Sequence, residues 1–103
     1  MIWNPAVESL PRDSMRAMQL ERLRAAVAWA GERVPFYRNA LAATDVEPSK
    51  LKSIEDLERL PFTRKAHLRE HYPWGLFAVP QSQLARIHAS SGTKGKPTVV
   101  GYT

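Results

Sequence analysis

The chain has 103 residues, 44% of them apolar, and carries 15 Lys and Arg against 10 Asp and Glu, which gives a net charge of +5. A chain of this length forms one small domain with a modest core. It contains no cysteine, which excludes disulfide bonds and thiolate metal ligands and favours a cytoplasmic location. We see no apolar run long enough to span a membrane and no signal peptide at the N-terminus.

The positive charges are interleaved with acids, as in residues 21–24, which read Glu-Arg-Leu-Arg. A basic balance is typical of proteins that bind nucleic acid or another phosphate-bearing partner. However, the sequence has no block of five like charges and no zinc-finger spacing. The densest basic cluster, at residues 59–69, is better explained as a solvated helical face than as a nucleic-acid patch.

Residues 1–10 show no periodicity, and we expect them to be irregular, with Trp3 and Val7 as anchors. From about Arg12 to Arg33 apolar residues recur with the period of a helix. The stripe consists of Leu20, Leu23, Val27, Ala30 and Val34. Pro35 marks its end, so a long amphipathic helix is predicted over residues 12–33.

A second helix is predicted from about residue 35 to residue 43, with Phe36, Tyr37 and Leu41 buried. Residues 44–50 are expected to form a connector. Ser53 and Asp56 have the spacing of a capping box, which predicts a short helix that stops near residue 60.

Thr63 is expected to cap another short helix, which runs from residue 64 to about residue 72 and ends at Pro73. An apolar loop follows over residues 74–80. Residues 84–90 are predicted to be a strand, and residues 98–103 a second strand. The sequence thus predicts a mainly α fold: a small helical N-terminal domain, residues 1–83, with one long helix and two to four short ones, followed by a β-hairpin over residues 84–103.

The hairpin carries a segment whose composition indicates a phosphate loop. Glycines let the backbone approach a ligand closely, and successive amides can form a nest for an anion. Hydroxyl and ammonium groups add hydrogen bonds and positive charge. The candidate nucleotide-binding residues are Ser90, Ser91, Gly92, Thr93, Lys94, Gly95 and Lys96. The Walker pattern and the G-x-G-x-x-G pattern both fail here, and a Gly/Ser-rich turn in an ordinary hairpin is the alternative.

The segment from Ser90 to Pro97 resembles the S-[ST]-G-[ST]-T-G-x-P signature of adenylate-forming enzymes. The longer string through Thr103 is similar to that of the phenylacetate–CoA ligases, in which SSGTTGKP is followed by TVVGYT. Further stretches that resemble this family occur in the same order along the chain. They are residues 3–5, 19–23, 34–38, 54–57, 60–63 and 72–78.

The resemblance implies an N-terminal part of a much longer enzyme that ends just after the phosphate loop. Such an enzyme activates phenylacetate or a similar aryl acid with Mg-ATP and transfers it to coenzyme A. The loop would hold the β- and γ-phosphates, while the catalytic lysine, the adenine contacts and the acyl pocket would lie elsewhere. No catalytic residue and no tightly bound cofactor are therefore expected in this chain alone, which should be inactive. Lys94 departs from the family, which usually has threonine there.

An isolated two-stranded hairpin is marginal in water and has exposed edges. We therefore expect residues 98–103 to be poorly ordered or held by a neighbouring molecule, and the chain to self-associate through this strand. A different class of function stays open: a small basic helical module that binds a partner protein or, less favoured, nucleic acid.

The three histidines are candidate functional residues. His67 and His71 have the i, i+4 spacing of a zinc pair, but no third ligand is near in sequence, so no metal site is predicted. His88 lies in the predicted strand two residues before the loop. Packing against neighbouring side chains accounts for it better than contact with a phosphate does.

Overall fold

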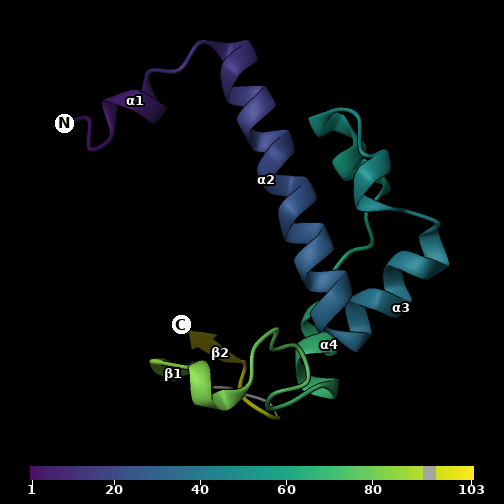
Figure 1. The fold of residues 1–103 in the computed structure, drawn as a ribbon. Helices are drawn as coiled ribbons and strands as arrows, with labels where there is room; N and C mark the ends of the chain where they lie inside the picture. Colours follow the sequence, from purple (N-terminus) through teal and green to yellow (C-terminus); the bar gives the residue numbers. More distant parts are fainter. Residues whose placement is uncertain (92–94) are drawn as a thin grey trace.

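Helix α2, Arg12–Arg33, is the longest element, and α3 and the two 3₁₀ helices that follow α3 lie along one side of it, whereas α1 lies on the other side (Figure 1). A computed structural model of the chain describes residues 1–91 and 95–103. The remaining elements, in chain order, are α1 Pro5–Glu8, α3 Pro35–Thr44, the 3₁₀ helices Pro48–Lys50 and Ile54–Arg59, α4 Lys65–Glu70, the 3₁₀ helix Gln81–Gln83, β1 Arg86–Ala89 and β2 Val99–Tyr102. The predicted mainly α fold with a terminal hairpin is confirmed.

The apolar stripe of α2 forms the core, as its period predicted. Val27 is buried in the middle of the helix, and Val34 is buried just after its end. Leu20 and Leu23 are partly buried against the same cluster. Burying one such aliphatic side chain contributes about 1.5–3 kcal/mol, so this stripe is what joins α2 to the rest of the helical unit.

The expectation that residues 1–10 are irregular was wrong, because Pro5–Glu8 form the short helix α1. Pro5 occupies the first helical position, where its missing N–H costs nothing. The Glu8 carboxylate accepts a hydrogen bond of 2.6 Å from the Asn4 N–H. Trp3 does not anchor this segment, since it is 92% exposed, and Figure 1 shows α1 well away from the hairpin.

Helix α3 forms where it was predicted, but its apolar residues are less buried than expected. Phe36, Tyr37 and Leu41 are half-buried. The Phe36 ring lies between two histidines of the α4 region, with ring centroids 4.8 Å from His67 and 5.0 Å from His71. These two rings cover part of α3 only, so α3 keeps a solvent-facing side.

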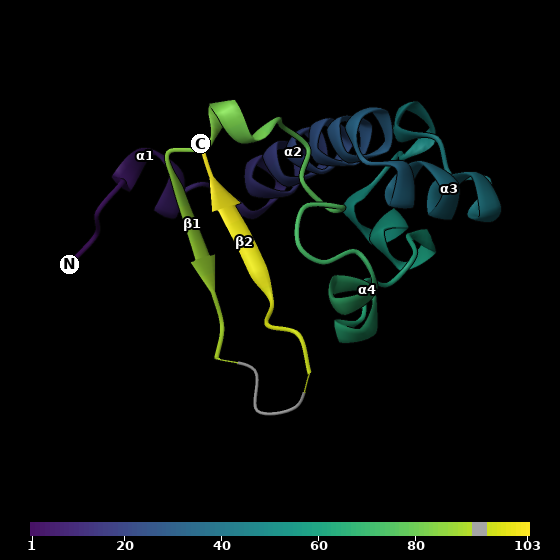
Figure 2. The same cartoon turned by 90° about the horizontal axis from the view of Figure 1, so that it is seen from below.

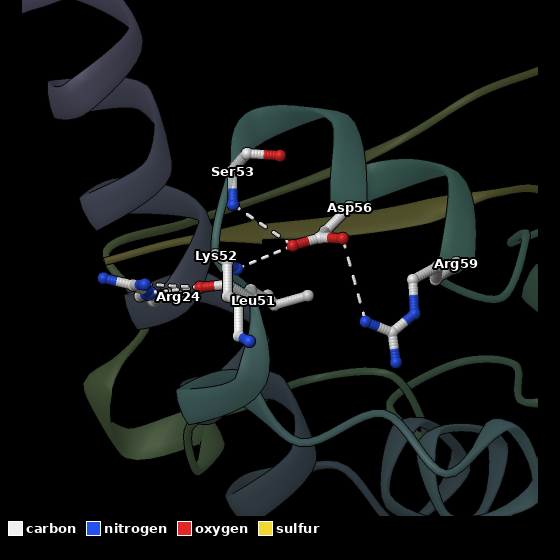
Figure 3. A network of polar contacts seen from close by, with 6 residues as sticks. All are labelled: Arg24, Leu51, Lys52, Ser53, Asp56 and Arg59. Carbon is white, nitrogen blue, oxygen red and sulfur yellow. Dashed lines mark hydrogen bonds and ion pairs between the residues drawn. The ribbon is translucent and has the colours of Figure 1, made fainter.

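The most deeply buried residue of the described chain is Leu51, which directly follows the predicted connector, residues 44–50, and has 0% exposure. It follows the 3₁₀ helix Pro48–Lys50 and packs with Val27 and Val46. Its backbone carbonyl accepts hydrogen bonds from Nε and Nη2 of Arg24, the former at 2.7 Å (Figure 3). This carbonyl is thereby paired although it sits beside the core.

The capping spacing of Ser53 and Asp56 did mark a helix start, although the helix that follows, Ile54–Arg59, is 3₁₀. Asp56 Oδ2 accepts hydrogen bonds from the backbone N–H of Lys52 at 2.6 Å and of Ser53 at 3.1 Å (Figure 3). Asp56 Oδ1 also lies 3.7 Å from Arg59 Nη1. The backbone amides of Lys52 and Ser53 lower the pKa of Asp56 because they stabilise its charged form, and the amide of Lys52 has the larger effect.

Helix α4 begins one residue later than expected. Arg64, and not Thr63, is its N-cap residue. The Arg64 N–H donates to Nδ1 of His67 at 3.1 Å, so the histidine takes the position that an acid has in a capping box. The Thr63 hydroxyl instead lies 2.9 Å from the Tyr37 hydroxyl, which ties α3 to the start of α4.

Strand β2 is paired and packed within this one chain, which differs from the expectation that residues 98–103 need a neighbouring molecule for order. Val99–Tyr102 pair antiparallel with Arg86–Ala89. An ideal Cβ on Gly101 would lie 2.8 Å from Phe77 Cε2 and 2.9 Å from Leu84 Cδ2. The hairpin therefore lies closely on the segment that precedes it, and this contact supplies what an isolated hairpin lacks.

Among the described residues, no helix is both long enough and apolar enough to cross a lipid bilayer.

Candidate functional site

The candidate loop is presented by the two strands of the hairpin (Figure 2). The register places Arg86 opposite Tyr102, His88 opposite Val100, and Ala89 opposite Val99. Because side chains alternate between the faces of a strand, Arg86 and His88 share one face with Tyr102. Beyond Ala89 and before Val99 the chain leaves the ladder, so Ser90, Ser91, Gly95 and Lys96 lie at the end of the hairpin.

Ser90 closes the base of the loop through both its backbone and its side chain. Its N–H donates to the Thr98 carbonyl at 2.9 Å. Its Oγ accepts from the Thr98 N–H at 3.0 Å. The Ser90 hydroxyl hydrogen is still available as a donor. Ser90 therefore both fixes the base of the loop and has a hydroxyl donor available for a ligand.

Four of the predicted site residues lie in the described part of the chain: Ser90, Ser91, Gly95 and Lys96. All four are exposed. Gly95 has φ of 89°, a conformation that residues with a Cβ rarely adopt. The other three, Gly92, Thr93 and Lys94, lie outside the described residues, so their predicted role is not tested by the structure.

Lys96 is the described cation of the loop, and it lies close to the helical unit. Its Nζ is 5.7 Å from the centroid of the Tyr72 ring, within the range of a cation–π contact. Figure 2 shows the segment that leads into β2 passing beside α4. Residues 89–103 contain no Asp or Glu. The positive charge of the loop is therefore not compensated by any acidic residue of the same segment.

The face of the hairpin that carries His88 is aromatic and basic. The His88 and Tyr102 rings meet edge to face with centroids 5.1 Å apart. The Arg86 guanidinium carbon lies 5.4 Å from the centroid of the Tyr102 ring. His88 thus packs against a neighbour, as expected.

The opposite face of the hairpin borders an apolar cleft that the sequence did not reveal. The cleft has a volume of about 430 Å³. It is lined by Trp29 and Tyr37 of the helical unit, Phe77 of the apolar loop and Val99 of β2, among others. No sequence signal could have indicated this cleft, because its walls come from five separate segments.

The structure gives His67 and His71 a packing role. Their rings flank Phe36, and His67 Nδ1 is used in capping α4. Within residues 1–91 and 95–103, no group of three or more His, Asp or Glu side chains is placed to hold a metal ion.

Comparison with solved structures gives the class of protein that shares this architecture. A 2-hydroxyisobutyryl-CoA ligase, solved with 2-HIB-AMP and CoA in the thioesterification state, matches 96% of the chain with a TM-score of 0.85 and 39% identity. The same ligase in the postadenylation state with R3-HIB-AMP matches 96% of the chain with a TM-score of 0.83. The chain covers 22% and 21% of those two chains. The fold described here thus occurs within a CoA ligase.

Curated relatives narrow the class further. The phenylacetate–coenzyme A ligase of Thermus thermophilus is 58% identical over 103 residues, which is 100% of this chain. Those of Aromatoleum evansii and Escherichia coli are 57% and 47% identical over 97 residues. This chain is therefore homologous over its whole length to part of the phenylacetate–CoA ligases, as its motifs indicated. It spans less than a quarter of the length of these relatives, 22–23%. No family model matches the chain.

Proposed function

We propose that this chain supplies the helical unit and the phosphate loop of an ATP-dependent ligase that adenylates phenylacetate, or a similar aryl acid, and transfers it to coenzyme A. The observation that carries the proposal is the 58% identity to a phenylacetate–coenzyme A ligase over all 103 residues, loop included. The chain alone is proposed to be inactive, because it corresponds to only 23% of that relative. The division into a helical region 1–83 and the start of an adenylating domain, 84–103, belongs to the same proposal.

The loop is proposed to bind the β- and γ-phosphates of ATP. Ser90 and Ser91 offer hydroxyl donors, Gly95 provides the φ of 89° at the turn, and Lys96 provides a charge. Gly92, Thr93 and Lys94 are assigned to the same role from their sequence pattern. Because the segment has no carboxylate, Mg²⁺ would arrive bound to the phosphates of ATP rather than to the loop.

In the proposed first step, an oxygen of the aryl carboxylate forms a bond to the α-phosphorus, and the bond from that phosphorus to pyrophosphate breaks. Negative charge accumulates on the departing pyrophosphate. Amide, hydroxyl and ammonium groups of the loop would stabilise that charge and orient the leaving group. The thiol of coenzyme A then displaces AMP from the acyl group to form the thioester. Since the reaction consumes ATP and coenzyme A, we place it in the cytoplasm.

A chimera tests this proposal. This chain would replace the 103 aligned residues of the Thermus thermophilus relative, and phenylacetyl-CoA formation from phenylacetate, ATP and CoA would be measured. We expect a folded chimera to form phenylacetyl-CoA. The Lys96→Ala substitution in this chimera should lower the rate of that reaction. The chimera with Lys94→Thr shows whether the unusual lysine alters turnover. A chimera that folds, by circular dichroism, but releases no pyrophosphate would contradict the proposal.

The same chain in isolation separates the two classes of function. On addition of Mg-ATP, amide NMR shifts confined to residues 90–96 would support the nucleotide loop. DNA binding that weakens steeply with salt would favour a basic interaction module instead. Sedimentation at increasing concentration would test self-association through the open edge of β2, which stays a prediction.

A further inference from the structure

The contact between Lys96 and Tyr72 joins the loop to a part of the helical unit that has no role in phosphate binding so far. Lys96 follows the turn at Gly95, whereas Tyr72 follows α4, whose last residue is Glu70. The ammonium nitrogen lies 5.7 Å from the ring centroid. A lysine side chain of this length has many rotamers in water, and ordering one of them costs conformational entropy.

Tyr72 is placed by a tight backbone turn. Its N–H donates to the Arg69 carbonyl at 3.3 Å, and the Gly75 N–H donates to the His71 carbonyl at 2.8 Å. A Cβ on Gly75 would lie 2.8 Å from that same carbonyl oxygen. The backbone on both sides of Tyr72 is thus held by hydrogen bonds and close packing.

The hairpin is held on the same frame. Gly101 of β2 lies against Phe77, and Phe77 N–H donates to the Trp74 carbonyl at 3.0 Å, within the turn that follows Tyr72. Both partners of the Lys96–Tyr72 contact are therefore attached to one short segment, residues 71–77. A ring placed in this way limits the directions that the lysine side chain takes.

A cation over the face of an aromatic ring uses only one side of the ammonium group. The remaining N–H donors stay free to form charge-assisted hydrogen bonds with an anion. The Tyr72 ring and a polyphosphate are therefore compatible partners of the same lysine.

We propose that Tyr72 is a positioning residue for the phosphate loop: its ring holds the Lys96 side chain in an orientation in which the ammonium group meets the phosphates of a bound polyphosphate. This inference rests on the proposed function, and it adds a residue of the helical unit to the site. It predicts that the ring matters and that the tyrosine hydroxyl does not.

The test uses NMR on the 103-residue chain, with inorganic tripolyphosphate as the probe, for the wild type, Tyr72→Leu and Tyr72→Phe. In the wild type the ring should shift the terminal methylene protons of Lys96 upfield, and tripolyphosphate should move the amides of Ser90, Ser91 and Lys96. Tyr72→Leu should abolish the upfield shift and weaken binding by about two- to fivefold, the range expected for loss of an exposed cation–π contact. Tyr72→Phe should keep both properties.

Unchanged amide shifts of Val100 and Gly101 show that the hairpin persists in each variant. Equal binding by the wild type and Tyr72→Leu would overturn the positioning role while leaving the proposed function intact. Loss of binding in Tyr72→Phe as well would also overturn it, because the hydroxyl would then be the required group. If tripolyphosphate leaves the loop amides of the wild type unmoved, the phosphate role of the loop fails, and the role of Tyr72 falls with it.

Discussion

The side chain of Arg24 donates from Nε and Nη2 to one acceptor, the backbone carbonyl of Leu51, 27 positions further along the chain (Figure 3). The planar guanidinium group is suited to such a two-pronged contact. The contact joins the middle of α2 to the fully buried Leu51, which directly follows the connector of residues 44–50. It therefore determines where the connector lies along α2.

Arg24→Met should lower the free energy of unfolding by about 1–3 kcal/mol, because it leaves the Leu51 carbonyl without its partner beside the core. Arg24→Lys should cost less, since an ammonium group can restore one of the two hydrogen bonds. Urea denaturation followed by circular dichroism measures both. Arg22→Met, at an exposed position of the same helix, is the control. Equal effects at positions 22 and 24 would show that the carbonyl contact is unimportant.

Leu51→Ala should destabilise the chain by about 2–5 kcal/mol, because it opens a cavity in a core of few residues. The matched control is Leu57→Ala, which removes the same atoms from a side chain that is 54% exposed. The control should change stability by less than about 1 kcal/mol. Thermal and urea denaturation are the measurements, and similar losses for the two variants would contradict the placement of Leu51.

Gly101→Ala should loosen the hairpin from the segment that carries Phe77 and Leu84. The added Cβ would approach both side chains to within 3 Å, and relieving such overpacking costs about 1–3 kcal/mol. Faster hydrogen exchange at the Ser90 amide, which bonds to Thr98, is the readout. Val100→Ala, on the other face, should leave this exchange nearly unchanged. If the Ser90 amide exchanges at the same rate in both variants, the packing of Gly101 does not hold the hairpin in place.

Asp56 should make stability depend on pH in the acid range. Its pKa is held below the ordinary value of 3.8 by the amides of Lys52 and Ser53. A carboxyl group whose pKa is lowered by folding stabilises the native state above its ordinary pKa, and that stabilisation is lost as the pH falls through the lower folded value.

Asp56→Asn should therefore be less stable than the wild type at neutral pH and approach it under strongly acid conditions. Glu58→Gln, an exposed acid in the same 3₁₀ helix, is the control and should show no such convergence. Urea denaturation across the acid range measures the difference. A difference in the free energy of unfolding between the wild type and Asp56→Asn that stays constant at all pH values would contradict the role of Asp56.

Several features of this protein could be predicted because their signals lie within a few neighbouring residues. The apolar period marked α2, and the spacing of Ser53 and Asp56 marked the start of the helix after them. The chemistry of Ser90–Lys96, together with the stretches that resemble the phenylacetate–CoA ligases, indicated the family that the comparisons then supported. The missed helix α1 also had a local signal, in Pro5 at its first position.

Other features were decided only by the tertiary structure. The burial of Leu51, the pairing of its carbonyl with Arg24, the half-burial of α3 and the contact of Lys96 with Tyr72 each require two segments that are distant in the sequence. The local sequence shows which side chains are apolar or charged. Whether a side chain is buried or paired depends on which distant segment packs against it. The helical period of α2, the helix start at Ser53 and the chemistry of the loop could therefore be predicted from local sequence, whereas packing between distant segments decided what holds that loop in place.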